Sequence, residues 1–157
     1  MAYDGMLTAR GPERPLPHVV GVRYASCHLS AASSCGRDAR EFVQQMLAGW
    51  GWPPSGPNGD LREVQALQDV LLLTTELAIN AAQHAHTPLE VSVRYAVGSH
   101  VRVEVHDEGG GCLPHPQWPA SFEESGRGLA LVDLLSAGWG VTSSPSGKTV
   151  WFELSLG

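Results

Sequence analysis

The sequence predicts an α+β protein, a two-layer α/β sandwich in which a mainly antiparallel sheet carries its helices on one face. The first observation is the order of the periodic segments, which runs strand, helix, helix, two strands, helix, two strands. The second is that both strand pairs are separated by short turns containing glycine, as in β-hairpins. These features are typical of one domain built around a single sheet.

The first half of the chain is expected to form one strand and two helices. Residues 19–29 are rich in β-branched and aromatic side chains, as strands are. Ser33 and Ser34 are candidate caps for a helix over residues 36–50, and the loop over 50–59 contains prolines and glycines that end it. Asp60 is the predicted cap of a second, long helix that includes residues 67–85.

The second half is expected to form two hairpins around a helix. Residues 89–97 and 100–107 alternate between apolar and polar side chains and are joined at Gly98-Ser99. Residues 109–126 predict a mobile loop, and residues 126–137 a helix. Residues 139–144 and 148–156 predict the closing hairpin.

Length and composition limit the possible functions. The chain has 157 residues, of which 1–17 are expected to be a flexible leader and 18–157 one domain. A net charge of −6 without a basic stretch excludes a general nucleic-acid binder. The three cysteines lack framework spacing, so we expect reduced thiols. No signal peptide or membrane span is apparent, and the expected location is the cytoplasm.

A polar stripe interrupts the otherwise apolar second helix. Glu76, Asn80 and His84 follow one another at four-residue intervals, and Asp69 and Gln83 fall on the same side. The stripe is either the solvated face of an amphipathic helix or one wall of a binding groove. Leu72 and Leu73 lie among the polar residues and the stripe carries no Lys or Arg, which weakens the solvated-face interpretation. In a groove, Glu, Asn and His side chains would suit a hard cation such as Mg²⁺, but the stripe alone does not decide between the two.

Two glycine-containing motifs follow. In HDEGGGC, residues 106–112, Asp107 ends a strand, and Gly109 and Gly111 allow the backbone to approach a flat ligand closely. A buried carboxylate only accepts hydrogen bonds, so it would take the amino group of adenine and disfavour guanine. In ESGRGLAL, residues 124–131, a glycine turn opens a helix whose backbone N–H groups can hold phosphate. Alone, each motif is equally compatible with an ordinary turn.

Together, the three segments resemble the GHKL (Bergerat) ATPase fold over roughly residues 20–156. The matching segments are residues 76–80, residues 107–111, a lid over about 112–125, and Gly126-Arg127-Gly128. The chain looks most like the anti-sigma-factor serine kinases of bacterial partner-switching systems, and its residues 147–154 resemble the closing strand of that group.

The resemblance implies a role for each motif. Asn80 would bind Mg²⁺, Asp107 would receive the adenine amino group, and Glu76 would be the base that orients a serine hydroxyl or a water. The other residues implied to shape the ATP site are His84, Gly109, Gly111, Gly126, Arg127, Gly128 and Leu129. The implied partners are a STAS-type anti-sigma antagonist, a sigma factor and a second copy of the chain in a homodimer.

One departure from the family pattern bears on activity. Several kinases of this type have a basic residue just before Ser-Gly-x-Gly, where this chain has Glu124. Three hypotheses therefore remain open: an ATP-dependent serine kinase acting on an anti-sigma antagonist, a module in which ATP gates partner binding without transfer, and the catalytic half of a sensor histidine kinase. The third is disfavoured because no helical hairpin with an acceptor histidine precedes the domain.

Overall fold

The computed structural model describes residues 5–10, 21–56, 58–109 and 128–157. Its elements, in chain order, are β1 (Gly5–Arg10), β2 (Val22–Leu29), α1 (Cys35–Gly49), α2 (Leu61–Ala85), β3 (Leu89–Ala96), β4 (His100–Asp107), α4 (Gly128–Leu135), β5 (Gly138–Ser144) and β6 (Gly147–Ser155). The order of the central elements is the predicted one, and both hairpins are present.

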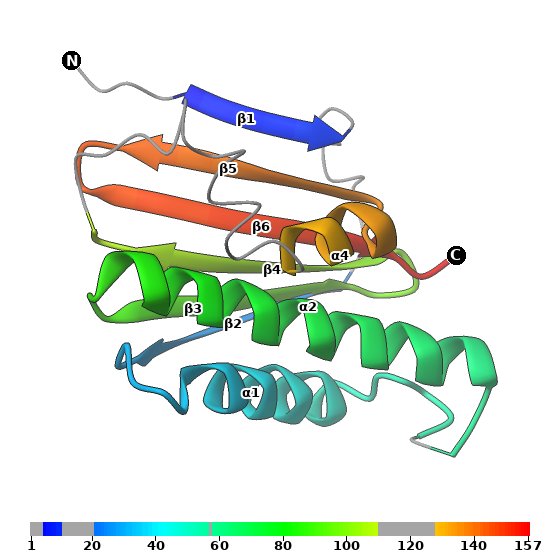
Figure 1. The fold of residues 1–157 in the computed structure, drawn as a ribbon. Helices are drawn as coiled ribbons and strands as arrows, with labels where there is room; N and C mark the ends of the chain where they lie inside the picture. The colour runs from blue at the N-terminus through cyan, green and yellow to red at the C-terminus, as the bar shows by residue number, and fades with distance from the viewer. Residues whose placement is uncertain (1–4, 11–20, 57, 110–127) are drawn as a thin grey trace.

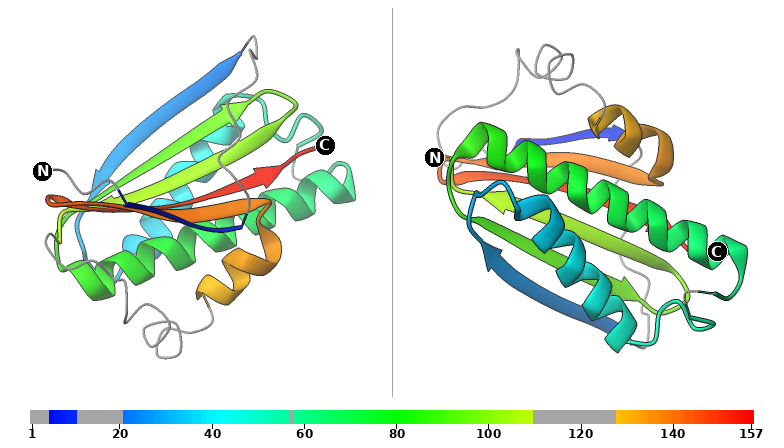
Figure 2. Two further views of the ribbon diagram at one scale, coloured as in Figure 1. Left: turned by 90° about the horizontal axis from the view of Figure 1, so that it is seen from above. Right: turned by 60° about the horizontal axis from the view of Figure 1, so that its bottom comes forward.

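The strands form one six-stranded sheet in the order β1-β5-β6-β4-β3-β2, and every neighbouring pair is antiparallel. All the described helices lie on the same face of this sheet (Figure 1), and the right-hand view of Figure 2 shows α1 and α2 in front of the strands. The predicted α+β sandwich with an antiparallel sheet and helices on one face is therefore confirmed.

One strand was not predicted. Residues 5–10 fall in the segment that the sequence assigns to a leader, yet they form β1 and pair with β5 from Gly5↔Ser143 to Arg10↔Trp139. The leader interpretation is wrong for these residues. The pairing that supplies their backbone hydrogen bonds comes from the far end of the chain, which no local pattern reveals.

The helix starts differ in how they are capped. Asp60 is the N-cap of α2, as predicted, and its carboxylate accepts a hydrogen bond from the Arg62 N–H at 2.7 Å. Ser34 occupies the N-cap position of α1, but its hydroxyl donates to the Asp38 carboxylate at 2.9 Å and caps no backbone N–H. The sequence thus predicts the position of both caps but the capping bond of only one.

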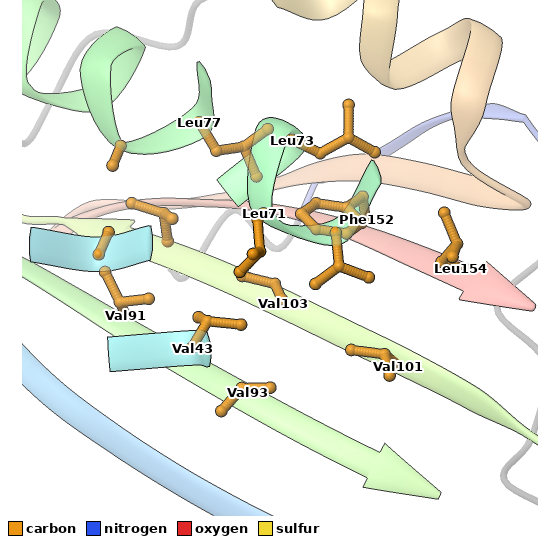
Figure 3. Close-up of a cluster of buried hydrophobic side chains, with 14 of the residues drawn as sticks. Val43, Leu71, Leu73, Leu77, Val91, Val93, Val101, Val103, Phe152 and Leu154 are labelled. Atoms are coloured by element: carbon orange, nitrogen blue, oxygen red, sulfur yellow. The ribbon is translucent and has the colours of Figure 1, made fainter. Parts of the chain in front are cut away.

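The core lies between α2 and the centre of the sheet. Leu71, Leu73 and Leu77 of α2 face Val103 of β4 and Phe152 of β6, and all five side chains are almost fully buried (Figure 3). Each such side chain contributes about 1.5–3 kcal/mol through its removal from water. This packing fixes the rotation of α2 about its axis, and hence the direction of its polar residues. Within the described part of the chain, no helix is long and apolar enough to span a bilayer.

A second contact holds α1 tightly against α2. A Cβ on Gly36 would lie 2.8 Å from Ile79 Cγ1 and 3.2 Å from Thr75 Cγ2, so only glycine permits this approach. Next to it, the buried Cys35 thiol donates to the Ala78 carbonyl at 3.6 Å. Burial raises the pKa of the Cys35 thiol, which stays protonated. Cys27 and Cys35 are both free thiols, as expected, and Cys112 lies outside the described residues.

Replacing Gly36 with alanine is expected to destabilise the fold by about 1 kcal/mol, because Ile79 must move to admit the new methyl group. The matched control is Gly49→Ala at the other end of α1, where a Cβ would meet nothing within 4 Å. There the gain in helix propensity should leave stability unchanged or raise it by up to about 1 kcal/mol. Urea unfolding of both variants measures the difference, and equal effects would contradict the close α1–α2 contact.

Candidate functional site

Three chain segments meet at one side of the molecule: the end of α2, the end of β4 and the turn between β5 and β6 (Figure 1). One hydrogen bond and one close backbone approach hold them together. The Glu108 N–H donates to Thr87 Oγ1 at 3.2 Å, which ties the residue after β4 to the segment after α2. A Cβ on Gly147 would lie only 1.9 Å from the Asp107 carbonyl oxygen, so the hairpin turn rests directly on the end of β4.

Asp107 is the buried carboxylate at this junction. It is the last residue of β4, and its side chain is 2% exposed. One carboxylate oxygen, Oδ1, accepts a hydrogen bond from the Gly109 N–H at 3.1 Å. The other, Oδ2, is buried and has no hydrogen-bond partner among the residues that the structure describes. An unsatisfied buried acceptor costs about 1–3 kcal/mol, which a ligand donor at this position would recover.

Gly109 is required for the approach of this segment to α2. A Cβ at residue 109 would lie 2.9 Å from Ala85 Cβ, 3.1 Å from Ala85 Cα and 3.2 Å from Asp107 Oδ1. Any other residue would push the strand end away from the helix or displace the carboxylate. The glycine that the sequence singles out for close approach therefore does allow one here, to the end of α2 and to Asp107.

The polar stripe of α2 divides into two kinds of residue. Gln83 and His84 are exposed, and Asp69 accepts a hydrogen bond from Gln65 Nε2 at 2.9 Å on the same helix, as expected for a solvated face. Glu76 and Asn80 are instead half-buried. The solvated-face interpretation thus fits part of the stripe, and Glu76 and Asn80 are the half-buried candidates for a groove, while the role implied for His84 stays a prediction.

Asn80 carries a second unsatisfied polar atom. Its amide nitrogen is buried and has no partner within the described ranges. Because the oxygen and nitrogen of an amide exchange places on a half-turn, either assignment leaves a polar atom that a ligand can satisfy. Asn80 lies about 7.5 Å along the helix axis from Ala85, which Gly109 approaches, and Glu76 is about one turn further. Along α2, starting from the end that Gly109 approaches, Asn80 therefore comes first and Glu76 second.

The phosphate-binding part of the predicted site is only partly described. Gly111, Gly126, Arg127 and the lid over 112–125 lie outside the described residues, so these predictions are neither supported nor opposed. A helix does follow the glycine turn, since α4 begins at Gly128 and includes Leu129, and it packs on α2. In the described part of the chain, no three His, Cys, Asp or Glu side chains gather into a metal site.

The sequence analysis missed two residues at this junction. Thr87 is not in any motif, and only the hydrogen bond from Glu108 shows its role in fixing the strand end. Lys148 lies directly opposite Asp107 in the β4–β6 ladder, which requires the strand register to be known. The sequence does single out Lys148 in one respect, since it is the only lysine in the chain.

The family-model comparison identifies the domain. The model of the histidine kinase-like ATPase domain matches residues 30–154, which is most of the chain. The chain belongs to the histidine kinase-like ATPase family. The resemblance that the motifs indicate is therefore confirmed, and Asn80, Asp107 and the start of α4 all lie inside the matched region.

Solved structures support the same fold. The RsbU and RsbW domains of Rv1364c from Mycobacterium tuberculosis match with a TM-score of 0.55 and 20% sequence identity. The match covers 83% of this chain and 32% of that longer one, so the present chain spans about a third of it. No curated protein matches the chain.

The residues present fit the nucleotide that this family binds. Histidine kinase-like ATPase domains bind ATP, usually with Mg²⁺. Asp107 Oδ2 is a buried acceptor, which suits an amino group of a base, and the partly buried amide of Asn80 suits a ligand rich in oxygen atoms. The two groups lie at successive positions along the junction of β4 and α2, as an extended ligand with a base and phosphates requires.

Substituting Gly109 with alanine is expected to weaken ATP binding about tenfold and to lower the free energy of unfolding by about 1 kcal/mol, because Ala85 or the Asp107 carboxylate must shift. Isothermal titration calorimetry and urea unfolding measure the two effects. Gly157→Ala is the control, since a Cβ there meets nothing within 4 Å. Wild-type affinity in Gly109→Ala would show that the close approach does not shape the site.

Proposed function

We propose that this chain is an ATP-binding protein serine kinase of the anti-sigma-factor type. It phosphorylates a STAS-type anti-sigma antagonist and regulates transcription by exchanging that partner for a sigma factor. The observation that carries the proposal is the buried Asp107 carboxylate, whose Oδ2 has no hydrogen-bond partner among the described residues and which lies inside the region that matches the histidine kinase-like ATPase domain. The order of the three sequence motifs and the structural likeness to a chain with an RsbW domain support the choice of group.

Base recognition follows from the chemistry of Asp107. Its Oδ1 is already engaged by the Gly109 N–H, so Oδ2 is the oxygen available to a ligand. An ionised carboxylate cannot donate a hydrogen bond, and it therefore accepts from the 6-amino group of adenine but opposes the carbonyl at the same position of guanine. An unpaired group of this kind costs about 1–3 kcal/mol, or roughly 5- to 150-fold in affinity. Asp107 would thus select adenine.

The phosphates and the metal are assigned to the other two motifs. Asn80 would offer its amide oxygen to Mg²⁺, which commonly takes one or two protein groups together with substrate phosphates. The bound Mg²⁺ would neutralise charge on the phosphate oxygens. Gly126, Arg127 and Gly128 would bring backbone N–H groups and one positive charge to the phosphates at the start of α4.

Glu76 is assigned the role of the base. It is half-buried on α2, one turn before Asn80, and its carboxylate has no hydrogen bond or ion pair within the described residues. It is therefore free to accept a proton from the hydroxyl of a partner's serine and to orient that hydroxyl toward the γ-phosphate. Phosphoryl transfer depends mainly on such positioning and on charge neutralisation.

A second function is favoured by one sequence feature. Glu124 stands where related kinases carry a basic residue, and a negative charge there opposes the developing charge on the transferred phosphoryl group. Under this alternative, the chain is an ATP-dependent regulatory module. Nucleotide binding changes its affinity for a protein partner, and no phosphate is transferred.

Asp107→Asn is expected to weaken ATP binding at least tenfold, because the amide presents a donor or a weaker acceptor to the adenine amino group. Calorimetric titration of Mg²⁺-ATP and Mg²⁺-GTP into wild type and variant measures this, with micromolar ATP affinity and much weaker GTP binding expected in wild type. Asp38→Asn on α1 makes the same chemical change away from the site and should leave both affinities unchanged. Equal ATP binding by Asp107→Asn would remove this residue from the site.

Glu76→Gln is expected to lower phosphoryl transfer at least about 100-fold, the usual size of a general-base contribution, while the Kd for ATP changes less than threefold. Transfer of ³²P from γ-labelled ATP to candidate STAS-type antagonists measures the rate, and calorimetry measures the affinity. Glu41→Gln on the exposed side of α1 is the control. ATP binding by wild type with no transfer to any antagonist would favour the regulatory module over the kinase.

A further inference from the structure

Lys148 is the only lysine among the ten basic residues of the chain. It follows Gly147 and opens the closing strand β6. The proposed mechanism does not use it, and it belongs to none of the glycine-containing motifs. Its position nevertheless places it next to the group that is proposed to read the base.

The strand register puts Lys148 beside Asp107. In the β4–β6 ladder, Asp107 pairs directly with Lys148, and opposite residues of antiparallel strands have Cβ atoms about 4.5–5.5 Å apart. Alternation along β6 places Lys148 on the same face as the buried Phe152, which is the face covered by the helices. Thr149 points to the other face, where its hydroxyl bonds His106 Nδ1 at 2.9 Å.

The fold does not account for this lysine. Its side chain is half-buried, yet no ion pair joins it to Asp107 or to any other acidic residue in the described ranges. Its backbone is held in place, because Gly147 rests against the Asp107 carbonyl. A half-buried lysine directly opposite a buried carboxylate oxygen, with neither group paired among the described residues, indicates that both groups serve a ligand.

We propose that Lys148 is a second base-reading residue, which donates a hydrogen bond from its ammonium group to ring nitrogen N1 of adenine while Asp107 accepts from the 6-amino group. The inference rests on the proposed ATP-binding function and deepens it. Adenine presents a donor and an acceptor side by side on this edge, and the Asp107–Lys148 pair presents an acceptor and a donor side by side across one ladder position. Guanine presents the reverse order, so both contacts would oppose it.

The choice of lysine fits this role. Its ammonium is a compact donor on a flexible stem, whereas an arginine fork is suited to the two oxygens of a carboxylate or phosphate. An arginine at position 148 would therefore tend to pair with the Asp107 carboxylate. That pairing would occupy the oxygen that adenine needs.

Binding of ATP, 1-deaza-ATP and 7-deaza-ATP to wild type and Lys148→Met tests the inference. Wild type should bind 1-deaza-ATP, which lacks N1, about tenfold more weakly than ATP, the size of one hydrogen bond to a charged group, and 7-deaza-ATP about as well as ATP. Lys148→Met keeps the aliphatic stem and should bind ATP about tenfold more weakly, with no further loss for 1-deaza-ATP. Arg40→Met on the exposed side of α1 removes the same charge and should behave as wild type.

Chemical labelling of the wild-type chain provides a test that does not depend on a variant folding. Lys148 carries the only side-chain amine, so acetylation by an amine-specific reagent can be followed at this one position by mass spectrometry. Saturating Mg²⁺-ATP should slow acetylation of Lys148 at least tenfold, while 1-deaza-ATP at equal occupancy should protect it less. The N-terminal amine serves as an internal reference.

One set of results would overturn the inference alone, and another would overturn the proposed function together with it. If wild type binds ATP and 1-deaza-ATP equally well, or if Lys148→Met retains the full 1-deaza penalty, Lys148 does not read N1 and the ATP site itself stands. Acetylation of Lys148 at the same rate with and without bound ATP would lead to the same conclusion. If wild type binds neither nucleotide, the proposed function fails together with the inference.

Discussion

The packing of α2 determines the arrangement of nearly every other part of this molecule. Leu71 and Leu77 bury its central face against the sheet, and Ile79 fits against Gly36 of α1 on one flank. Even Thr74, which is fully buried there, has its hydroxyl satisfied by the Val70 carbonyl of the same helix. Asn80, which is half-buried, does not belong to these packed sides. The polar stripe is therefore aimed by hydrophobic contacts on the other faces of the helix.

The candidate site has no continuous sequence of its own. It is made where separate elements end, and glycines make that meeting possible: Gly109 admits the end of α2, and Gly147 admits the end of β4. These close approaches surround Asp107, which is 2% exposed. A group held in this way is preorganised, since a ligand that pairs with it need not order it first.

Much of this arrangement can be predicted from the sequence, because periodicity and turn chemistry are local signals. The strand pair ending at Asp107, the helix starting after Asp60 and the helix after the glycine turn all follow from residues within a few positions of one another. At Ser34 two local contacts compete, since the Asp38 carboxylate, four residues further on, takes the hydroxyl that was expected to cap the helix. β1 and the pairing of Lys148 with Asp107 depend on which distant strands become neighbours, and no local pattern contains that information.

The pairing of β1 with β5 has a consequence for how the protein is made. Gly5 pairs with Ser143, so a strand near the start of the chain finds its neighbour only near the end. During synthesis, β1 has no pairing partner until the helices and the hairpin of β3 and β4 have been made. Closing the long segment of chain between β1 and β5 is then entropically costly. The β2, β3 and β4 side of the sheet can therefore pair first during biogenesis, and the β1 edge is completed last. Until then, β5 is an open edge to which another nascent chain can pair.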